Sequence, residues 1–191
     1  MDKPKTPVIL ASQSPRRTEL LKTIIKNFRV VPSNIDETCN TDLLPEENAI
    51  LLASKKADFV AKLHPQHLII GADTLVVLKN KIIGKPNNPE NARQILRQLS
   101  GQEHKVITGL ALVHLKNFSA ASVSHVRIKK LTANEIDSYV ECGEPMDKAG
   151  AYAIQGKGSF LVEGYDGSYS NIVGLPIELL KNLLQKLNLS F

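Results

Sequence analysis

The chain has no tryptophan, two cysteines and few aromatic residues, which make up 5% of its 191 residues. Cys39 and Cys142 lie far apart and outside any CxxC or Cys/His cluster, which excludes a disulfide framework and a structural zinc site. We interpret both as reduced thiols. Because few rings are present to stack bases, and lysines and arginines are scattered, the net charge of +5 does not by itself predict a nucleic-acid surface. A small polyanionic ligand explains the basic excess equally well.

Long apolar runs are also missing, and none approaches the roughly 20 residues that span a bilayer. Residues 1–5, Met-Asp-Lys-Pro-Lys, lead into an apolar strand rather than a cleavable signal, so we expect a cytoplasmic protein without membrane contact. With 42% hydrophobic residues, the chain is expected to form a single domain over residues 1–191, or one domain with two lobes.

Apolar periodicity and capping signals predict strands and helices that alternate in the first half, followed by adjacent long strands. Strands are expected at residues 8–11, 28–31, 68–73, 75–78, 82–83, 106–115 and 122–130. Helices are expected at residues 15–25, 45–63, 89–99, 133–142 and 175–189. In this scheme Asp73 ends a strand, residues 75–83 form a hairpin, and the two long strands pair antiparallel. The order predicts an α/β fold with a mixed sheet rather than a purely parallel one.

The segment Ser12-Gln-Ser-Pro-Arg-Arg17 lies between the first expected strand and helix. Ser14 is a suitable N-cap, and Pro15 suits the first helical position. Two hydroxyl groups, two guanidinium groups and the N–H groups of the helix N-terminus could therefore meet phosphate oxygens. A capped helix with solvated arginines fits the local pattern as well.

Three further positions carry charges that suit a phosphate site. Asp73 follows a fully apolar strand, where a carboxylate commonly faces a ligand crevice, although a turn-forming aspartate is the alternative. Lys55 and Lys56 share one helix, and the spacing does not decide which lysine turns inward. Lys85 in Gly-Lys-Pro follows a glycine that permits close approach to a ligand, which alone is a weak signal.

Residues 147–158 are rich in small side chains and hold one amide, Gln155, that can both donate and accept hydrogen bonds at a nucleobase edge. A sharp turn without a ligand would account for the glycines equally well. Established signatures are missing: the chain has no GxxxxGK[ST], no complete GxGxxG and no GxSxG. His64 and His67 flank Pro65 without a suitably spaced carboxylate, so no zinc site is predicted.

Read together and in order, the motifs resemble those of the Maf family, the septum-formation-inhibitor-like nucleotide pyrophosphatases. The matching motifs are Leu10-Ala-Ser-Gln-Ser-Pro-Arg-Arg17, Gly71-Ala-Asp-Thr74, Gly84-Lys-Pro86, Leu99-Ser-Gly101, Asp147-Lys-Ala-Gly-Ala-Tyr152, Gln155-Gly156, Gly167-Ser-Tyr-Ser-Asn171 and Gly174-Leu-Pro176. They span nearly the whole chain, and their combination is far more specific than any one of them.

The resemblance implies an elongated mixed sheet with flanking helices and a central cleft between two lobes, similar to the inosine triphosphate pyrophosphatases. It also implies a homodimer and hydrolysis of a nucleoside triphosphate between its α- and β-phosphates with Mg²⁺ or Mn²⁺. The implied catalytic residues are Asp73 as proton acceptor, Lys56, Lys85 and Arg17. Phosphate binding is implied for Ser12, Ser14, Arg16 and Arg17, and metal binding for Glu37 and Asp73.

Arg16, Thr74 and Gln155 resemble the specificity residues of the dTTP/UTP branch rather than those of the 7-methyl-GTP branch. Because an ordinary aspartate pKa is about 3.9, Asp73 can act on water only if a metal acidifies that water, or else Asp73 is itself a ligand. Modified pyrimidine nucleotides remain possible substrates. A regulator of cell division that binds nucleotides or nucleic acid without turnover is the alternative, although we expect no stable nucleic-acid complex.

Overall fold

The structure is a computed structural model that describes residues 6–187. Its strands are β1 (Val8–Ala11), β2 (Arg29–Val30), β3 (Leu68–Leu78), β4 (Lys81–Ile83), β5 (Glu103–Val113), β6 (Phe118–Ile128) and β7 (Val162–Asp166). Its α-helices are α1 (Pro15–Lys22), α2 (Pro45–Leu63), α3 (Pro89–Leu99), α4 (Ala133–Glu141), α5 (Tyr169–Val173) and α6 (Ile177–Leu187). Three short 3₁₀ helices are η1 (Glu144–Asp147), η2 (Ala149–Ala151) and η3 (Gly156–Leu161).

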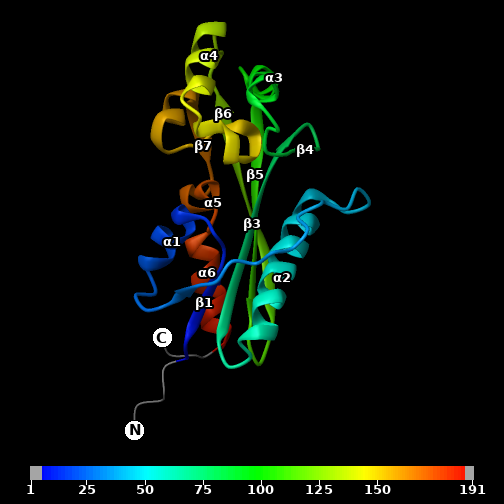
Figure 1. Cartoon of the computed structure of the whole chain (residues 1–191), viewed down its shortest axis with the longest axis vertical. Helices are drawn as coiled ribbons and strands as arrows, with labels where there is room; N and C mark the ends of the chain where they lie inside the picture. The colour runs from blue at the N-terminus through cyan, green and yellow to red at the C-terminus, as the bar shows by residue number, and fades with distance from the viewer. Residues whose placement is uncertain (1–5, 188–191) are drawn as a thin grey trace. The chain divides into compact units, whose positions relative to one another are not determined.

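The strands form one seven-stranded sheet in the order β2-β1-β3-β5-β6-β7, with β4 paired to β3 (Figure 1). Strand β1 runs parallel to β2 and β3, whereas β4 runs antiparallel to β3, and β7 antiparallel to β6. The predicted α/β fold with a mixed sheet is therefore confirmed. The chain divides into two compact units, and β3, β5 and β6 each contribute residues to both.

The first unit comprises residues 6–73, 108–122 and 174–187 of the described chain. Side chains of β1 alternate between two hydrophobic clusters. Leu10 packs in one cluster with residues of α1 and α6, and Ile9 packs in the other with residues of α2. Helices α1 and α6 therefore cover one face of the sheet, and α2 covers the opposite face (Figure 1). Because both faces are buried, β1 is apolar at every position.

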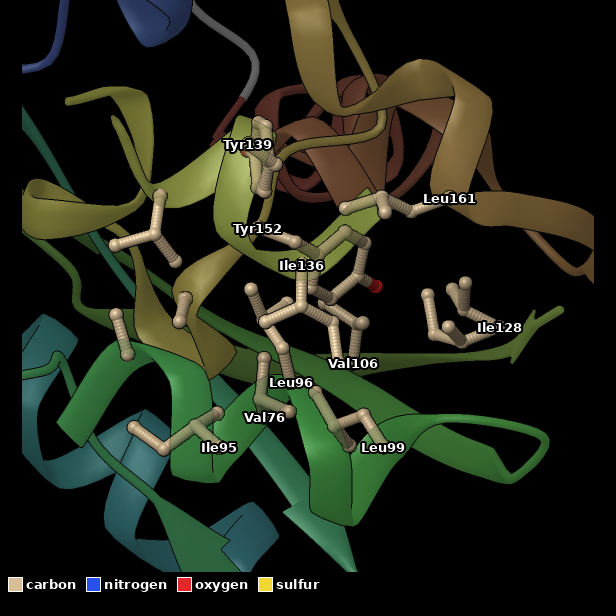
Figure 2. Packing of buried hydrophobic residues seen from close by; sticks show 14 of the residues in the cluster. Val76, Ile95, Leu96, Leu99, Val106, Ile128, Ile136, Tyr139, Tyr152 and Leu161 are labelled. Carbon is tan, nitrogen blue, oxygen red and sulfur yellow. The ribbon is translucent and has the colours of Figure 1, made fainter. Parts of the chain in front are cut away.

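The second unit comprises residues 74–107 and 123–173. Its core joins one face of α3 to α4, β5, β6 and the irregular segment that follows α4 (Figure 2). The labelled side chains of this cluster are Val76, Ile95, Leu96, Leu99, Val106, Ile128, Ile136, Tyr139, Tyr152 and Leu161.

Capping signals placed several helices at the positions that the structure gives them. Helices α2 and α3 have the predicted bounds, and both begin with the predicted proline. Thr132 and Glu135 form the predicted capping box of α4, since Glu135 N–H donates to Thr132 Oγ1 and Thr132 N–H donates to Glu135 Oε2.

Other predicted boundaries were wrong. Helix α1 ends at Lys22 rather than Ile25, because the last turn tightens and the Thr23 hydroxyl donates to the Leu20 carbonyl. The long strands each begin about three or four residues earlier than predicted, at Glu103 and Phe118. Helix α6 begins at Ile177, and the predicted end at residue 189 lies outside the described residues. Strand β7, helix α5 and the 3₁₀ helices were not predicted.

Candidate active site

The Ser12–Arg17 segment joins β1 to α1 in the first unit. Ser14 is the N-cap, as predicted, and its hydroxyl accepts a 3.4 Å hydrogen bond from Arg17 N–H. Ser12 is buried, and its Oγ accepts from Ser14 N–H and from Arg17 Nη1, both at 3.2 Å. One serine hydroxyl thus orders both the turn and a guanidinium group at the start of the helix.

Arg17 is held between two of the sequence motifs. Its Nε donates a 2.7 Å hydrogen bond to the carbonyl oxygen of Gly174, which begins the Gly-Leu-Pro motif. Burial lowers the pKa of Arg17, and the nearby carboxylates of Asp73 and Glu37 oppose that change. The guanidinium group therefore lies in the electric field of both acids, although they are distant from it in sequence.

Lys56 forms the centre of the site in the first unit. Its Nζ donates to Asp73 Oδ1 at 2.5 Å and lies 2.7 Å from Glu37 Oε1. Lys56 and Asp73 are both buried, with 6% exposure each, whereas the Glu37 side chain is about half exposed. Two carboxylates share one ammonium group, and the Arg17 charge balances the remaining negative charge. The structure also answers the question that spacing left open, because Lys55 is exposed while Lys56 points inward.

A close approach of helix to strand brings Lys56 to Asp73. A Cβ atom on Gly71 of β3 would lie 2.3 Å from the Ala53 carbonyl oxygen and 2.9 Å from Ala57 Cβ, both in α2. Only glycine leaves space for this contact between the two backbones. Since Lys56 follows Ala53 by three residues and Asp73 follows Gly71 by two, each polar side chain lies on the same side of its element as the contact.

Asp73 does not end a strand, contrary to the prediction. Strand β3 continues from Leu68 to Leu78, so Asp73 lies inside an eleven-residue strand. The apolar residues after Thr74 extend the sheet and pair with β4 around the two-residue turn Lys79-Asn80. The polar Asp-Thr pair suggested an end, but the backbone of β3 continues because the sheet supplies neighbours, and Lys56 pairs with the buried carboxylate.

Sequence reasoning missed Asn48, which is fully buried at the start of α2. Its Nδ2 donates to the carbonyl oxygens of Asn40 and Leu43 at 2.9 and 3.2 Å, and its Oδ1 accepts from Asn40 N–H at 2.7 Å. These bonds fix the end of the loop that carries Glu37. An asparagine among the apolar positions of an amphipathic helix was the signal that could have revealed it.

Cys39 belongs to the same loop and was interpreted only as an ordinary thiol. Burial, and the charges of Asp73 and Glu37, raise its pKa, so the thiol stays protonated beside the site. It is a free cysteine, as is Cys142.

The remaining predicted residues belong to the second unit or lie at the surface. Thr74 follows Asp73 directly in β3 and is partly buried. Lys85 is exposed after β4, where it lines a pocket of about 440 Å³ together with Ile83, Asn91 and Gln98. Gln155 is partly exposed, and Arg16 is partly exposed at the start of α1. The structure therefore joins five predicted residues of the first unit in one cluster, namely Ser12, Arg17, Glu37, Lys56 and Asp73. Thr74, Lys85 and Gln155 belong to the second unit.

Oxygen donors for a cation come from the acidic pair. Glu37 and Asp73 each present an oxygen within 2.7 Å of the same Lys56 Nζ, so the two carboxylates face one point. Among residues 6–187, no group of three or more His, Cys, Asp or Glu side chains is arranged to hold a metal ion. Two carboxylates without further protein ligands fit Mg²⁺, which usually takes one or two carboxylates together with substrate phosphates.

Among residues 6–187, no helix is long and apolar enough to cross a membrane.

The fold is that of a known class of α/β proteins. It matches the solved structure of the Staphylococcus aureus Ham1 protein with a TM-score of 0.57 and 15% sequence identity, covering 96% of this chain and 100% of that one. At this identity the likeness is one of fold, and it agrees with the architecture that the motifs implied.

The chain belongs to the Maf family, since the family described as Maf-like protein matches residues 7–187. A dTTP/UTP pyrophosphatase of Syntrophus aciditrophicus is 44% identical over 188 residues, covering 96% of this chain and 92% of the relative. A dTTP/UTP pyrophosphatase of Halalkalibacterium halodurans is 48% identical over 172 residues, covering 90% of each.

Proposed function

We propose that this protein hydrolyses dTTP and UTP to the monophosphate and pyrophosphate. The observation that carries the proposal is the buried Lys56 ammonium group shared by Asp73 and Glu37 next to Arg17. This arrangement combines cations that attract phosphate oxygens with carboxylates that can act on water or a metal. Relatives at 44% and 48% identity that carry the name dTTP/UTP pyrophosphatase support the same substrates.

Cations are the main catalytic resource for a triphosphate, which carries about four negative charges at neutral pH. We assign Arg17, Lys56 and Lys85 to the phosphates. Ser12, Ser14 and Arg16 assist them at the N-terminus of α1, where backbone N–H groups and the helix dipole favour an anion. Water attacks the α-phosphorus, the bond from that phosphorus to the bridging oxygen breaks, and pyrophosphate leaves.

The two carboxylates are assigned to water and to a divalent cation. Glu37 and Asp73 would hold Mg²⁺ or Mn²⁺, and such a cation supplies positive charge to phosphate oxygens and acidifies water. Asp73 serves either as the acceptor of the water proton or as a ligand. In both roles it must exchange part of its bond with Lys56, whose Nζ is then available to a phosphate oxygen.

Base selection is assigned to Arg16, Thr74 and Gln155. The Gln155 amide can donate to one carbonyl and accept from the ring N–H of uracil or thymine, whereas cytosine presents a different donor and acceptor order. Modified pyrimidine nucleotides that keep this edge fall within the same proposal. The homodimer implied by the family and the cytoplasmic location expected from the sequence are part of it, and the whole chain acts as one catalytic domain.

A nucleotide-binding regulator without turnover is the second candidate, which the pI of about 9.2 favours. Its weakness is chemical, because a site for binding alone gains nothing from a buried carboxylate beside phosphates.

The deciding experiment measures pyrophosphate release from dTTP, UTP, CTP, GTP and ATP, with and without Mg²⁺ or Mn²⁺. We expect metal-dependent release from dTTP and UTP, and a fall of at least roughly 100-fold in Asp73→Asn because the charge is lost in either role. Nucleotide affinity and the unfolding midpoint should change little, since the substitution is nearly isosteric. Asp58→Asn, at an exposed position of α2, is the matched control. Tight nucleotide binding without release in the wild type would support the regulator instead.

A further inference from the structure

Gln155 lies in a bend of the second unit that has no regular secondary structure of its own. Within the described part of the chain, its amide makes no hydrogen bond, so the position of the amide depends on the backbone of residues 153–158. This backbone is unusual, because Gly156 has a positive φ of 68°. Whatever fixes the two ends of the bend therefore also places the amide.

One pair of side chains holds both ends. Ala153 N–H donates a 3.2 Å hydrogen bond to the Tyr139 hydroxyl, and Gly158 N–H donates a 2.9 Å hydrogen bond to Glu144 Oε2. Glu144 also acts on the Tyr139 hydroxyl, since its carboxylate helps to raise the pKa of that hydroxyl. Backbone groups two residues before and three residues after Gln155 are thus joined through Tyr139 of α4 and Glu144 of η1.

The Tyr139 hydroxyl is buried and closely packed against the bend. The side chain is buried with 2% exposure, and Figure 2 shows its ring at the edge of the hydrophobic cluster. Burial and the adjacent Glu144 charge raise the pKa of Tyr139, so the hydroxyl keeps its proton and its donor. A Cβ atom on Gly158 would lie 2.5 Å from the Tyr139 oxygen. The hydroxyl therefore occupies the space that this glycine leaves open.

The residues that lead into the bend, Gly150 and Tyr152, are held by other contacts. Tyr152 Oη lies 2.8 Å from His104 Nε2, and Gly150 N–H donates to the Gly84 carbonyl oxygen at 3.1 Å. Gly84 precedes Lys85, so this backbone bond ties the segment to the lysine loop. Because these contacts do not involve Tyr139, removing its hydroxyl should loosen the bend while leaving Gly150, Tyr152 and Lys85 in place.

We infer that Tyr139 and Glu144 are positioning residues that set pyrimidine selectivity through Gln155. The inference rests on the proposed function, in which Gln155 reads the base. A loosened bend lets the amide leave the geometry that distinguishes uracil from cytosine, whereas the phosphate-binding cations are held by other contacts. Selectivity should therefore change more than turnover.

The test compares kcat and KM for UTP and CTP in Tyr139→Phe, which keeps the ring and removes the hydroxyl. We expect the UTP-to-CTP ratio of kcat/KM to fall roughly 3- to 10-fold, the effect of one lost hydrogen bond. The change should appear mainly in KM for UTP. Glu144→Gln keeps an acceptor for Gly158 and should retain the ratio, whereas Glu144→Ala should lower it. Tyr165→Phe, at an exposed tyrosine of the same unit, is the matched control.

Combination with Gln155→Ala separates the inference from the proposed function. If Gln155→Ala lowers the ratio and Tyr139→Phe lowers it no further in that background, Tyr139 acts through Gln155 as inferred. Additive effects, or an unchanged ratio in Tyr139→Phe, overturn the inference and leave the proposed function intact. An unchanged ratio in Gln155→Ala overturns the inference and the assignment of base reading to Gln155, whereas the proposed hydrolysis is tested separately by pyrophosphate release. If Tyr139→Phe does not fold, Glu144→Ala in the two backgrounds gives the same decision.

Discussion

The buried His104 makes the stability of the second unit depend on pH in a way that can be calculated. His104 has 2% exposure, and burial lowers its pKa from the ordinary 6.5 to about 4. Its Nε2 pairs with Tyr152 Oη, while its buried Nδ1 has no hydrogen-bond partner within residues 6–187. A charged imidazole would therefore stand in an apolar core without compensation.

The sign follows from the order of the two pKa values. The unfolded chain takes up the proton near pH 6.5, and the folded chain does so only near pH 4. Stability from the neutral imidazole is therefore present above pH 6.5 and is lost as pH falls toward 4. For these two pKa values the loss between pH 7 and pH 5 is about 2 kcal/mol. The full loss at lower pH is about 3 kcal/mol.

Urea unfolding followed by circular dichroism at pH 7, 6 and 5 measures this loss. His104→Gln keeps a hydrogen-bonding group for Tyr152 and cannot titrate, so its free energy of unfolding should fall less between pH 7 and 5, by about 2 kcal/mol. Burial also lowers the pKa of His67, but that residue is present in both proteins and cancels in the difference. Contacts with Lys129 and Thr132 lower the pKa of Glu135 to about 2, so its contribution is lost mainly below this pH window.

The reasoning is refuted if wild type and His104→Gln lose the same free energy of unfolding between pH 7 and 5. His114→Gln, at a histidine outside the second unit, is the control and should behave like the wild type.

Three further predictions concern the first unit. Lys56→Met leaves the buried Asp73 carboxylate without its ammonium partner, so we expect the free energy of unfolding to fall by about 3 kcal/mol. Adding Asp73→Asn should recover part of this loss. Equal stability of the single and double variants would contradict the prediction. Gly71→Ala places a Cβ atom 2.3 Å from the Ala53 carbonyl oxygen. This clash should destabilise the fold by about 1–3 kcal/mol and lower turnover by moving Lys56. Gly84→Ala, with open space around the glycine, is the control and should leave stability nearly unchanged. Removal of divalent cations with EDTA should abolish pyrophosphate release but barely shift the unfolding midpoint, because Lys56 already pairs with both carboxylates; a large shift would indicate a structural metal.

Much of the fold could be read from local signals in the sequence. Proline at the first helical position placed the starts of α2 and α3, and the polar cap Asn88 also marked the start of α3, since these residues satisfy or remove N–H groups that a helix leaves unpaired. Strand β1 is apolar at every position, as expected of a strand that is buried on both faces of the sheet. Such signals work because a cap pairs with residues close to it in the chain, and because a strand buried on both faces reads as a continuous apolar run.

Boundaries that depend on distant partners were not predictable in this way. Residues after Asp73 continue β3 because the sheet supplies neighbours, whatever the polarity of the side chain between them. Strand β7 consists of the polar stretch Val162–Asp166, which becomes a strand by pairing with β6. Helix α1 likewise ends early through a tight last turn that its apolar periodicity does not show.

For the site, the ordered motifs determined the family and the candidate residues, because side-chain chemistry and spacing are written in the chain. Only the tertiary structure decided that Lys56 rather than Lys55 faces Asp73, since that choice depends on how closely α2 approaches Gly71. The same holds for Asn48, which fixes the Glu37 loop, and for the Tyr139 and Glu144 pair at the Gln155 bend. Each role depends on at least one contact between residues separated by eight or more positions, and a linear pattern contains no distance between such groups.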